Sequence, residues 1–295
     1  MHPASSFAAF RGWFLPFLAI LVLSTGGWAT TLRVVAWNIE WFPGQQRLDA
    51  THEMERGHME RVQKRLKEMA PDIFLASEIR DWKSFEELVS VVPDLRVHVV
   101  SSFRDRDTGG LWPQQLAIAS RLPVRAAWFE PWRPTMWGNP RGFSFAALED
   151  PGSNGLILVY SLHLKSNRSF NEEMAQTNFR HRNESIRQLL LHIEEMETIV
   201  FAGQVTGVIV GGDINTCHDG RFGDRVVEMM VEAGFRNTWA ETPREERLTW
   251  RGSDRFPPTT FDYIFVRGLP SGRARMMEVA PDESDHHAVG LLLQR

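Results

Sequence analysis

Six short motifs place acids, amides or histidines at the ends of apolar stretches. They are "VVAWNIE", "DIFLASE", "LVYSLHLK", "VIVGGDIN", "FDYIFV" and "SDHHAV". Their polar residues are Asn38, Glu40, Glu78, His163, Asp213, Asn215, Asp262, Asp285, His286 and His287. A buried carboxylate without a partner is strongly unfavourable, so acids repeated at strand ends require hydrogen-bond donors or a cation. We therefore expect these strand ends to converge on one polar pocket.

Such a pocket would hold mostly oxygen ligands. Carboxylate and amide oxygens suit a hard cation, Mg²⁺ first and Mn²⁺ or Ca²⁺ as alternatives. A zinc site fits less well, because the chain has one Cys and no HExxH spacing. A simpler alternative is that each acid caps a helix or starts a turn. That accounts for any single acid but not for His163 inside "YSLHLK".

The stretches that carry these motifs predict strands, which alternate with stretches of helical periodicity. Strands are expected at residues 31–39, 72–77, 96–101, 115–120, 155–164, 207–213, 261–266 and 287–293. Helices are expected at residues 53–70, 183–199 and 223–233, where apolar side chains recur on one side. No linker rich in Pro, Gly or Ser separates the halves of the chain. The pattern favours one layered α/β domain over two domains in series.

Three stretches lack a clear period and are predicted to be long loops, namely residues 101–115, 128–142 and 240–260. The second loop contains Trp128, Trp132 and Trp137 beside arginines. Aromatic rings beside arginine stack on nucleic-acid bases, and Trp also favours a lipid interface. The third alternative is that these rings pack over a sheet edge.

Several basic residues outside the motifs are further candidates. Arg141 and Lys165 could contact a phosphate group of the substrate, the alternative being a solvated charge. Arg180 and Arg182 precede the helix expected at residues 183–199, so they either reach the pocket or pair on the surface.

The first 29 residues are typical of a signal peptide. Arg11 precedes an apolar stretch of about 12 residues, where a membrane-spanning helix needs ~20. Gly27 and Ala29 are small residues at the positions that signal peptidase favours, so cleavage is expected after Ala29. We expect an exported protein, periplasmic or secreted, whose single domain spans residues 30–295.

The composition of the chain is that of an ordinary globular protein, with 43% hydrophobic and 24% charged residues. Its formal net charge of −4 excludes the general basic field of a DNA-coating protein. Phosphate binding would therefore be local or assisted by a metal ion. Cys217 is the single cysteine, so the chain has no intramolecular disulfide and depends on its core for stability.

The order of the motifs resembles the endonuclease/exonuclease/phosphatase superfamily, which includes pancreatic-type deoxyribonucleases, abasic-site endonucleases, inositol polyphosphate phosphatases and neutral sphingomyelinases. The resemblance extends from about residue 31 to residue 293. It implies a four-layered α/β sandwich, two packed mixed β-sheets flanked by helices, and metal-dependent cleavage of phosphate esters. The family often has Gln where this chain has Ser77, and many members lack a counterpart of His287.

The resemblance also implies a role for each motif residue. The residues at the divalent metal would be Asn38, Glu40 and Glu78, with Asp285 close by. Asp213 and Asn215 would position or activate the attacking water, and His163 would contact the scissile phosphate or assist the leaving group. Asp262 would hold His286, the imidazole nearest the phosphorus. Of the two adjacent histidines, the first is expected to be catalytic.

Together these observations predict an exported, metal-dependent phosphodiesterase, most simply a nuclease of the endonuclease or exonuclease type. It is expected to act on nucleic acid as a monomer, with no obligate protein partner. One alternative is a phospholipase C or sphingomyelinase-like enzyme acting on a lipid head group, or a phosphatase of small phosphoesters. The last alternative, a catalytically inactive binding protein, would lack motif acids or imidazoles, and none is missing.

Overall fold

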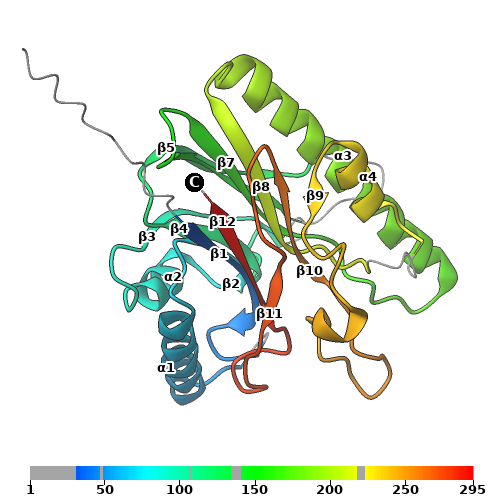
Figure 1. The fold of residues 1–295 in the computed structure, drawn as a ribbon. Helices are drawn as coiled ribbons and strands as arrows, with labels where there is room; N and C mark the ends of the chain where they lie inside the picture. Colours follow the sequence, from blue (N-terminus) through cyan, green and yellow to red (C-terminus); the bar gives the residue numbers. More distant parts are fainter. Residues whose placement is uncertain (1–30, 47–48, 106–107, 134–140, 218–222, 295) are drawn as a thin grey trace, which may run out of the picture.

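The computed structural model describes residues 31–46, 49–105, 108–133, 141–217 and 223–294 (Figure 1). The expected signal peptide, residues 1–29, lies outside the described residues, as does Trp137. Within the described part of the chain, no helix is long and apolar enough to span a bilayer.

The first of two six-stranded sheets joins the two ends of the described chain. Its strand order is β11-β12-β1-β2-β4-β3. The bounds are β1 Thr31–Phe42, β2 Ile73–Ile79, β3 Arg96–Val100, β4 Gln115–Ser120, β11 Arg275–Met277 and β12 Ala288–Gln294. Strands β1 and β2 are parallel, whereas β1 and β12 are antiparallel, with Thr31 opposite Gln294.

The second six-stranded sheet has the order β5-β6-β7-β8-β10-β9. Its strands are β5 Val124–Pro131, β6 Gly142–Glu149, β7 Leu156–His163, β8 Val205–Asp213, β9 Arg236–Asn237 and β10 Asp262–Arg267. Strands β7 and β8 are parallel, and the other pairs are antiparallel. Each sheet therefore contains one parallel pair at its centre, whose strands end at the same edge.

Helices cover the outer face of each sheet, so the molecule has four layers (Figure 1). On the first sheet lie α1 His52–Met69 and α2 Trp82–Val89; on the second lie α3 Glu172–Glu195 and α4 Val226–Glu232. A π-helical turn, Met196–Val200, continues α3, and a 3₁₀ turn spans Arg244–Glu246. This arrangement confirms the four-layered α/β sandwich.

The alternation of β1 shows why the sequence forms these layers. Val35 and Trp37 pack against α1 and α2, while Val34 and Ala36 face the second sheet. The two sheets approach closely at Gly211 of β8, where an added Cβ would lie 2.7 Å from a Leu75 methyl group. A larger residue at this position would force the sheets apart close to the end of β8.

Some elements differ from the sequence-based expectation. The predicted loop 128–142 begins inside β5 and ends inside β6, and α2 was not expected. Trp128 packs on Phe145 with ring centroids 4.3 Å apart, and Trp132 is buried against Phe143. For these two Trp residues the sheet-packing alternative holds: Trp132 is buried and the half-buried Trp128 packs on the sheet.

Candidate active site

The carboxyl ends of the two parallel strand pairs meet at one edge of the sandwich. The amide of Asn38, on β1, donates to Glu78 Oε1 (3.2 Å) at the end of β2. The same nitrogen donates to Asp213 Oδ2 (3.1 Å) at the end of β8. Asn38 therefore links the polar groups of the first sheet to those of the second.

β-Bulges direct the acids of β1 and β2 into this space. The β1–β2 register shifts between Asn38 and Phe42, and the β2–β4 register shifts between Ser77 and Ile79. Glu40 and Glu78 have left-handed φ values of 41° and 63°, respectively. Because non-glycine residues avoid this region and bulges re-aim side chains, the backbone here is strained to present two carboxylates.

Glu40, Glu78 and Asp285 form the carboxylate side of the site. Glu40 Oε2 accepts hydrogen bonds from the backbone N–H of Asp285 and the amide of Gln45, both at 2.9 Å. Glu78 Oε2 accepts from the Trp41 N–H at 3.0 Å. Burial, followed by the charge of Asp285, raises the pKa of Glu40. A cation among these oxygens would relieve that cost, so the donor set fits a hard divalent metal.

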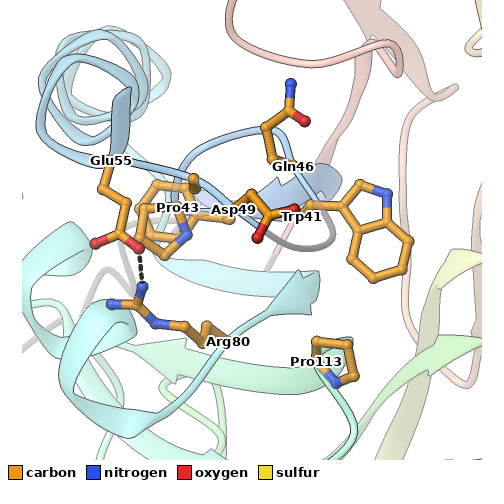
Figure 2. A pocket seen from close by; sticks show the side chains of 9 residues that line it. Trp41, Pro43, Gln46, Asp49, Glu55, Arg80 and Pro113 are labelled. Carbon is orange, nitrogen blue, oxygen red and sulfur yellow. Dashed lines mark hydrogen bonds and ion pairs between the residues drawn. The ribbon is translucent and has the colours of Figure 1, made fainter. Parts of the chain in front are cut away.

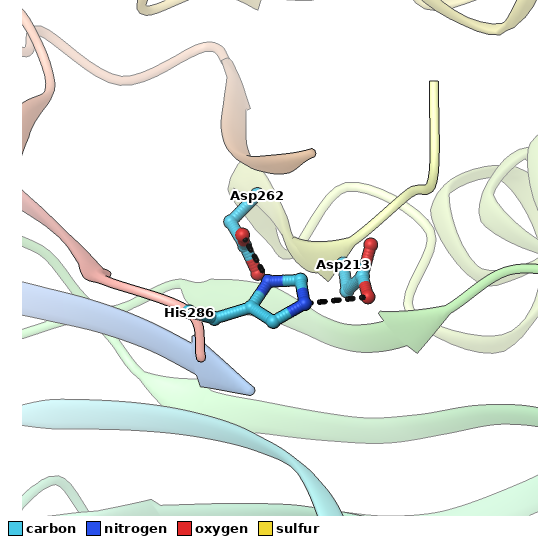
Figure 3. Close-up of side chains that lie close together, drawn as sticks. All are labelled: Asp213, Asp262 and His286. Atoms are coloured by element: carbon cyan, nitrogen blue, oxygen red, sulfur yellow. Dashed lines mark hydrogen bonds and ion pairs between the residues drawn. The ribbon is translucent and has the colours of Figure 1, made fainter. Parts of the chain in front are cut away.

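Asp262 and His286 form a buried acid/base pair. Asp262 Oδ2 lies 2.7 Å from His286 Nδ1, which directs His286 Nε2 toward Asp213 (Figure 3). Although burial opposes the charge, the carboxylate of Asp262 raises the pKa of His286 well above its ordinary value. His286 is therefore an imidazolium near neutral pH.

Asp213 lies beside this pair and beside His163. Its register partners are His163 on β7 and Asp262 on β10. Its Oδ1 accepts from the Asn215 N–H at 2.9 Å. Burial raises the pKa of Asp213 to about 7, against the opposing charge of His286. This carboxylate can therefore exchange a proton near neutral pH.

Asp213, Asp262 and His286 each offer one ligand atom within 4.8 Å of the others, which is close enough to hold a cation. However, Asp262 Oδ2 and His286 Nδ1 already share a hydrogen bond. We therefore interpret the three as a proton-handling cluster, and the oxygen-rich carboxylate side as the better cation site.

His163 lies at the end of β7, in reach of both sides. Its Nε2 atom is 3.5 Å from Asp213 Oδ2 and 3.9 Å from Glu78 Oε1. Burial, followed by the charge of Arg141, lowers the pKa of His163 well below its ordinary value. Its Nδ1 atom is buried without a hydrogen-bond partner among the described residues. A neutral imidazole of this kind can donate one hydrogen bond to an oxygen.

The guanidinium of Arg141 makes its hydrogen bonds to other groups of the protein. It donates to the carbonyls of His163 (3.0 Å) and Leu164 (2.9 Å) and to Gln114 Oε1 (2.8 Å). Burial lowers its pKa to about 10. Arg141 thus fixes the end of β7 that carries His163, and the phosphate contact expected for it stays a prediction. Lys165 follows in the same segment, and burial lowers its pKa.

Arg182 supports the site from α3. Its Nε and one terminal nitrogen donate to Asp224 Oδ2 at 2.9 and 2.6 Å, and its other nitrogen donates to the Lys165 carbonyl at 3.0 Å. The hydroxyl of Thr216 donates to the same Asp224. The sequence left this role open, yet Arg182 is spaced four residues before Ile186 on the buried helix face, a placement that signals a buried partner.

The two adjacent histidines face different surroundings. His286 is buried beside Asp262, whereas the half-buried His287 accepts a hydrogen bond at Nδ1 from the Val279 N–H (3.2 Å). His286 alone is thus directed at the polar cluster. The order of their side chains agrees with the alternation expected for the start of β12.

A cavity of about 170 Å³ is lined in part by Trp41, Phe42 and Pro43, which follow Glu40 in the chain (Figure 2). Its lining residues are Trp41, Phe42, Pro43, Gln46, Asp49, Ala50, Glu55, Arg80 and Pro113. Arg80 is paired with Glu55 on its wall (Figure 2). No local pattern in the sequence indicated this cavity, because its walls come from β1, α1 and several loops.

Comparisons with known proteins identify the family and the fold. A model of the Endonuclease/Exonuclease/phosphatase family matches residues 35–286. No curated protein matches the sequence. Solved structures share the fold at low identity. An endonuclease/exonuclease/phosphatase from Beutenbergia cavernae DSM 12333 is 18% identical, with a TM-score of 0.64 over 90% of this chain and 71% of that one.

Two further structures cover nearly the whole length of both chains. The endonuclease/exonuclease/phosphatase from Bacteroides vulgatus is 18% identical, with a TM-score of 0.62 over 90% of this chain and 98% of that one. D. rerio TDP2, complexed with a single-strand DNA product, is 16% identical, with a TM-score of 0.62 over 90% and 100%. At such identities these structures establish the fold.

Proposed function

Because the chain belongs to the Endonuclease/Exonuclease/phosphatase family, we propose that it is a metal-dependent phosphodiesterase and, more specifically, a nuclease. The observation that carries this proposal is the position of Asn38, which contacts both Glu78 and Asp213. Asn38 therefore joins the oxygen-rich cation site, through Glu78, to the proton-handling cluster, through Asp213. Hydrolysis of a phosphodiester requires both parts: the cation offsets the charge of the phosphate group, and the cluster removes a proton from the attacking water.

The cation would be held by Glu40 and Glu78, with Asn38 and Asp285 adjacent. Mg²⁺ suits these oxygen donors best, and Mn²⁺ or Ca²⁺ are alternatives. When bound, the ion offsets charge on the phosphoryl oxygens. Each carboxylate already accepts a backbone N–H, which limits how far its oxygens can turn.

The buried residues around Asp213 would move the protons. The imidazolium of His286 offsets negative charge on the phosphate and is held in one orientation by Asp262. Asp213, whose pKa is raised to about 7 by burial, orients the attacking water and accepts its proton. Asn215 fixes Asp213 through its backbone N–H. The neutral His163 donates a hydrogen bond to a phosphate oxygen or to the leaving group.

Nucleic acid is the proposed substrate class. The support is the shared fold with D. rerio TDP2, which was solved with a single-strand DNA product. The alternative of a lipid head group draws on export and on the Trp-rich segment, and two rings of that segment, Trp128 and Trp132, pack against Phe145 and Phe143. The phosphoesters of lipids and of small molecules are therefore alternative outcomes of the substrate test.

The deciding experiment is a substrate panel with the purified protein. Single- and double-stranded DNA, RNA, sphingomyelin and a simple phosphodiester would be incubated with Mg²⁺, with and without EDTA. We expect DNA or RNA to be cleaved and EDTA to abolish cleavage. Cleavage of sphingomyelin alone would replace the nuclease assignment, and undiminished cleavage in EDTA would contradict the metal-dependent mechanism.

We also propose export through residues 1–29, which leaves a monomeric domain of residues 30–295 in the periplasm or medium. The support is the apolar stretch after Arg11 and the small residues Gly27 and Ala29. Fractionation of cells expressing the full chain, with N-terminal sequencing of the product, should give a mature protein that starts at Thr30. Retention of Met1 in the cell interior would contradict export, and size-exclusion chromatography tests the monomer.

A further inference from the structure

His58 is a buried imidazole outside the residues assigned above. It lies on the inner face of α1, which also buries Met59, Val62 and Leu66. Its ring meets Phe42 edge to face, with centroids 5.3 Å apart. Buried ring nitrogens of histidine are usually hydrogen-bonded, and His58 is only 1% exposed.

Both nitrogens of His58 are bonded to backbone groups. The N–H of Gly44 donates to Nδ1 at 2.8 Å, so Nδ1 carries no proton. The Nε2 atom therefore carries the proton and donates to the carbonyl of Glu283 at 2.8 Å. The ring is thus a neutral bridge of fixed length between two segments that are remote in sequence.

These two segments carry the carboxylates of the proposed cation site. Gly44 and Gln45 form the turn that follows Glu40, and Glu283 precedes Asp285 by two residues. Gln45 donates to Glu40 Oε2 (2.9 Å) and to the Pro281 carbonyl (3.0 Å). The Asp285 N–H donates to the same oxygen of Glu40. A displacement of either segment would therefore change the separation of the two carboxylates.

We propose that His58 is a positioning residue that sets the geometry of Glu40 and Asp285 for a divalent cation. The inference rests on the proposed function, since it assumes that these carboxylates bind the metal. A histidine suits this position because its rigid ring presents an acceptor and a donor on different sides. Both bonds go to backbone groups of Gly44 and Glu283, so they do not depend on the side-chain rotamers of those two segments.

Other contacts between α1 and the second segment are more exposed. Arg61 donates to the Asp282 carbonyl, and Arg65 donates to Glu283 Oε2 at 3.0 Å. The side chains of Arg61 and Arg65 are 40% and 30% exposed, respectively. Because water competes for exposed hydrogen bonds, each of these contacts contributes little to holding the segment in place. His58 is the buried link in this set. Burial lowers its pKa to about 4, so the bridge persists at neutral pH.

The test uses the variant His58→Phe, which keeps an aromatic ring of similar size and removes both hydrogen bonds. The matched control is His98→Phe, which removes a half-buried imidazole bonded to Ser120 at 2.8 Å, on β3 at the far edge of the same sheet. Calorimetry would measure the Kd of Mn²⁺ and Mg²⁺ for each metal-free protein. Circular dichroism and thermal unfolding would verify the fold.

We expect His58→Phe to raise the Kd of the metal about 10- to 100-fold, as loss of an outer partner of metal ligands commonly does. His98→Phe should leave the Kd unchanged, although it lowers Tm. Cleavage by His58→Phe at saturating Mg²⁺ should approach that of the unaltered protein. A metal affinity equal to that of the unaltered protein, or the same weakening in His98→Phe, overturns the inference.

His58→Asn covers the case in which the Phe variant does not fold, because the Asn side-chain oxygen can still accept from Gly44. It should weaken metal binding by an intermediate factor, and unchanged binding in this folded variant also overturns the proposal. The two proposals fail separately. An unaltered protein that binds metal but cleaves no phosphodiester removes the proposed function alone, whereas one that binds no metal removes both.

Discussion

The two sheets contribute acids of opposite character to one site. On the first sheet, the side chain of Asp285 is 44% exposed, and it shares its surroundings with Glu40 and Glu78. On the second sheet, Asp262 is fully buried and is bonded to His286. A partly hydrated set of oxygens suits a cation that keeps some of its water, whereas a buried pair suits proton transfer. The partly exposed Asp285 and the buried Asp262 thus suit different tasks, and the buried Glu78 of the carboxylate side is bonded to Asn38.

The largest effect should come from the buried side. His286→Gln removes the charged imidazole and leaves an amide that can still bond to Asp262. We expect the rate of phosphodiester cleavage to fall by about 10²- to 10⁴-fold, the usual contribution of an acid/base group. The Kd for Mg²⁺, measured by calorimetry, should change little. A large change in metal binding would break the division between the two sides.

Asp262→Asn tests the same side through the charge of its histidine. The pKa of His286 is raised above its ordinary value of 6.5, and the variant should lower it. The imidazolium–carboxylate pair therefore stabilises the fold below about pH 6.5. That stabilisation is lost as the pH rises through the raised pKa of the folded state.

Titration of the His286 ring protons by NMR should show this decrease in pKa, together with a rate loss of about 10²-fold. Thermal unfolding at pH 6 and at higher pH should show that the loss of stability in Asp262→Asn is larger at pH 6. An unchanged His286 pKa would mean that another group holds the charge.

On the carboxylate side, Glu78→Gln keeps the shape of the side chain and removes its charge. Glu78 Oε1 accepts from Asn38 and Oε2 accepts from the Trp41 N–H, so the oxygen of the introduced amide can keep one of these bonds while its NH2 group gives up the other. We expect the Mg²⁺ concentration for half-maximal activity to rise about 10- to 100-fold. The pKa of His286 should stay near that of the unaltered protein. A shift in that pKa with unchanged metal dependence would reverse the comparison.

The smallest effect is expected for Lys165→Met, which belongs to neither side. Lys165 is half-buried, and burial lowers its pKa. If its amine contacts a substrate phosphate, its loss should raise KM less than about tenfold, since a partly solvated ion pair contributes up to about 1 kcal/mol. The measurement is KM for a DNA oligonucleotide at fixed Mg²⁺. An unchanged KM would leave Lys165 as a solvated charge.

Local patterns predicted the strands that carry the motifs, because β-branched stretches and their polar ends lie within a few residues of each other. They did not predict β5, whose residues are mostly half-exposed, the buried strand β6 or the short helix α2. The bulges that re-aim Glu40 and Glu78 depend on neighbouring strands. The supports at His58 and Arg182 depend on partners that are remote in sequence, and no local period contains that information.

The antiparallel pairing of β1 with β12 has a consequence for synthesis of the protein. The strand made first among the described residues completes its sheet only when the strand made last is added, and the loop before β12 supplies Asp285 and His286. A nascent chain that has not reached residue 285 lacks part of both sides of the site. If the chain is the nuclease proposed above, ribosome-bound and truncated products would lack a complete site for cleaving nucleic acid.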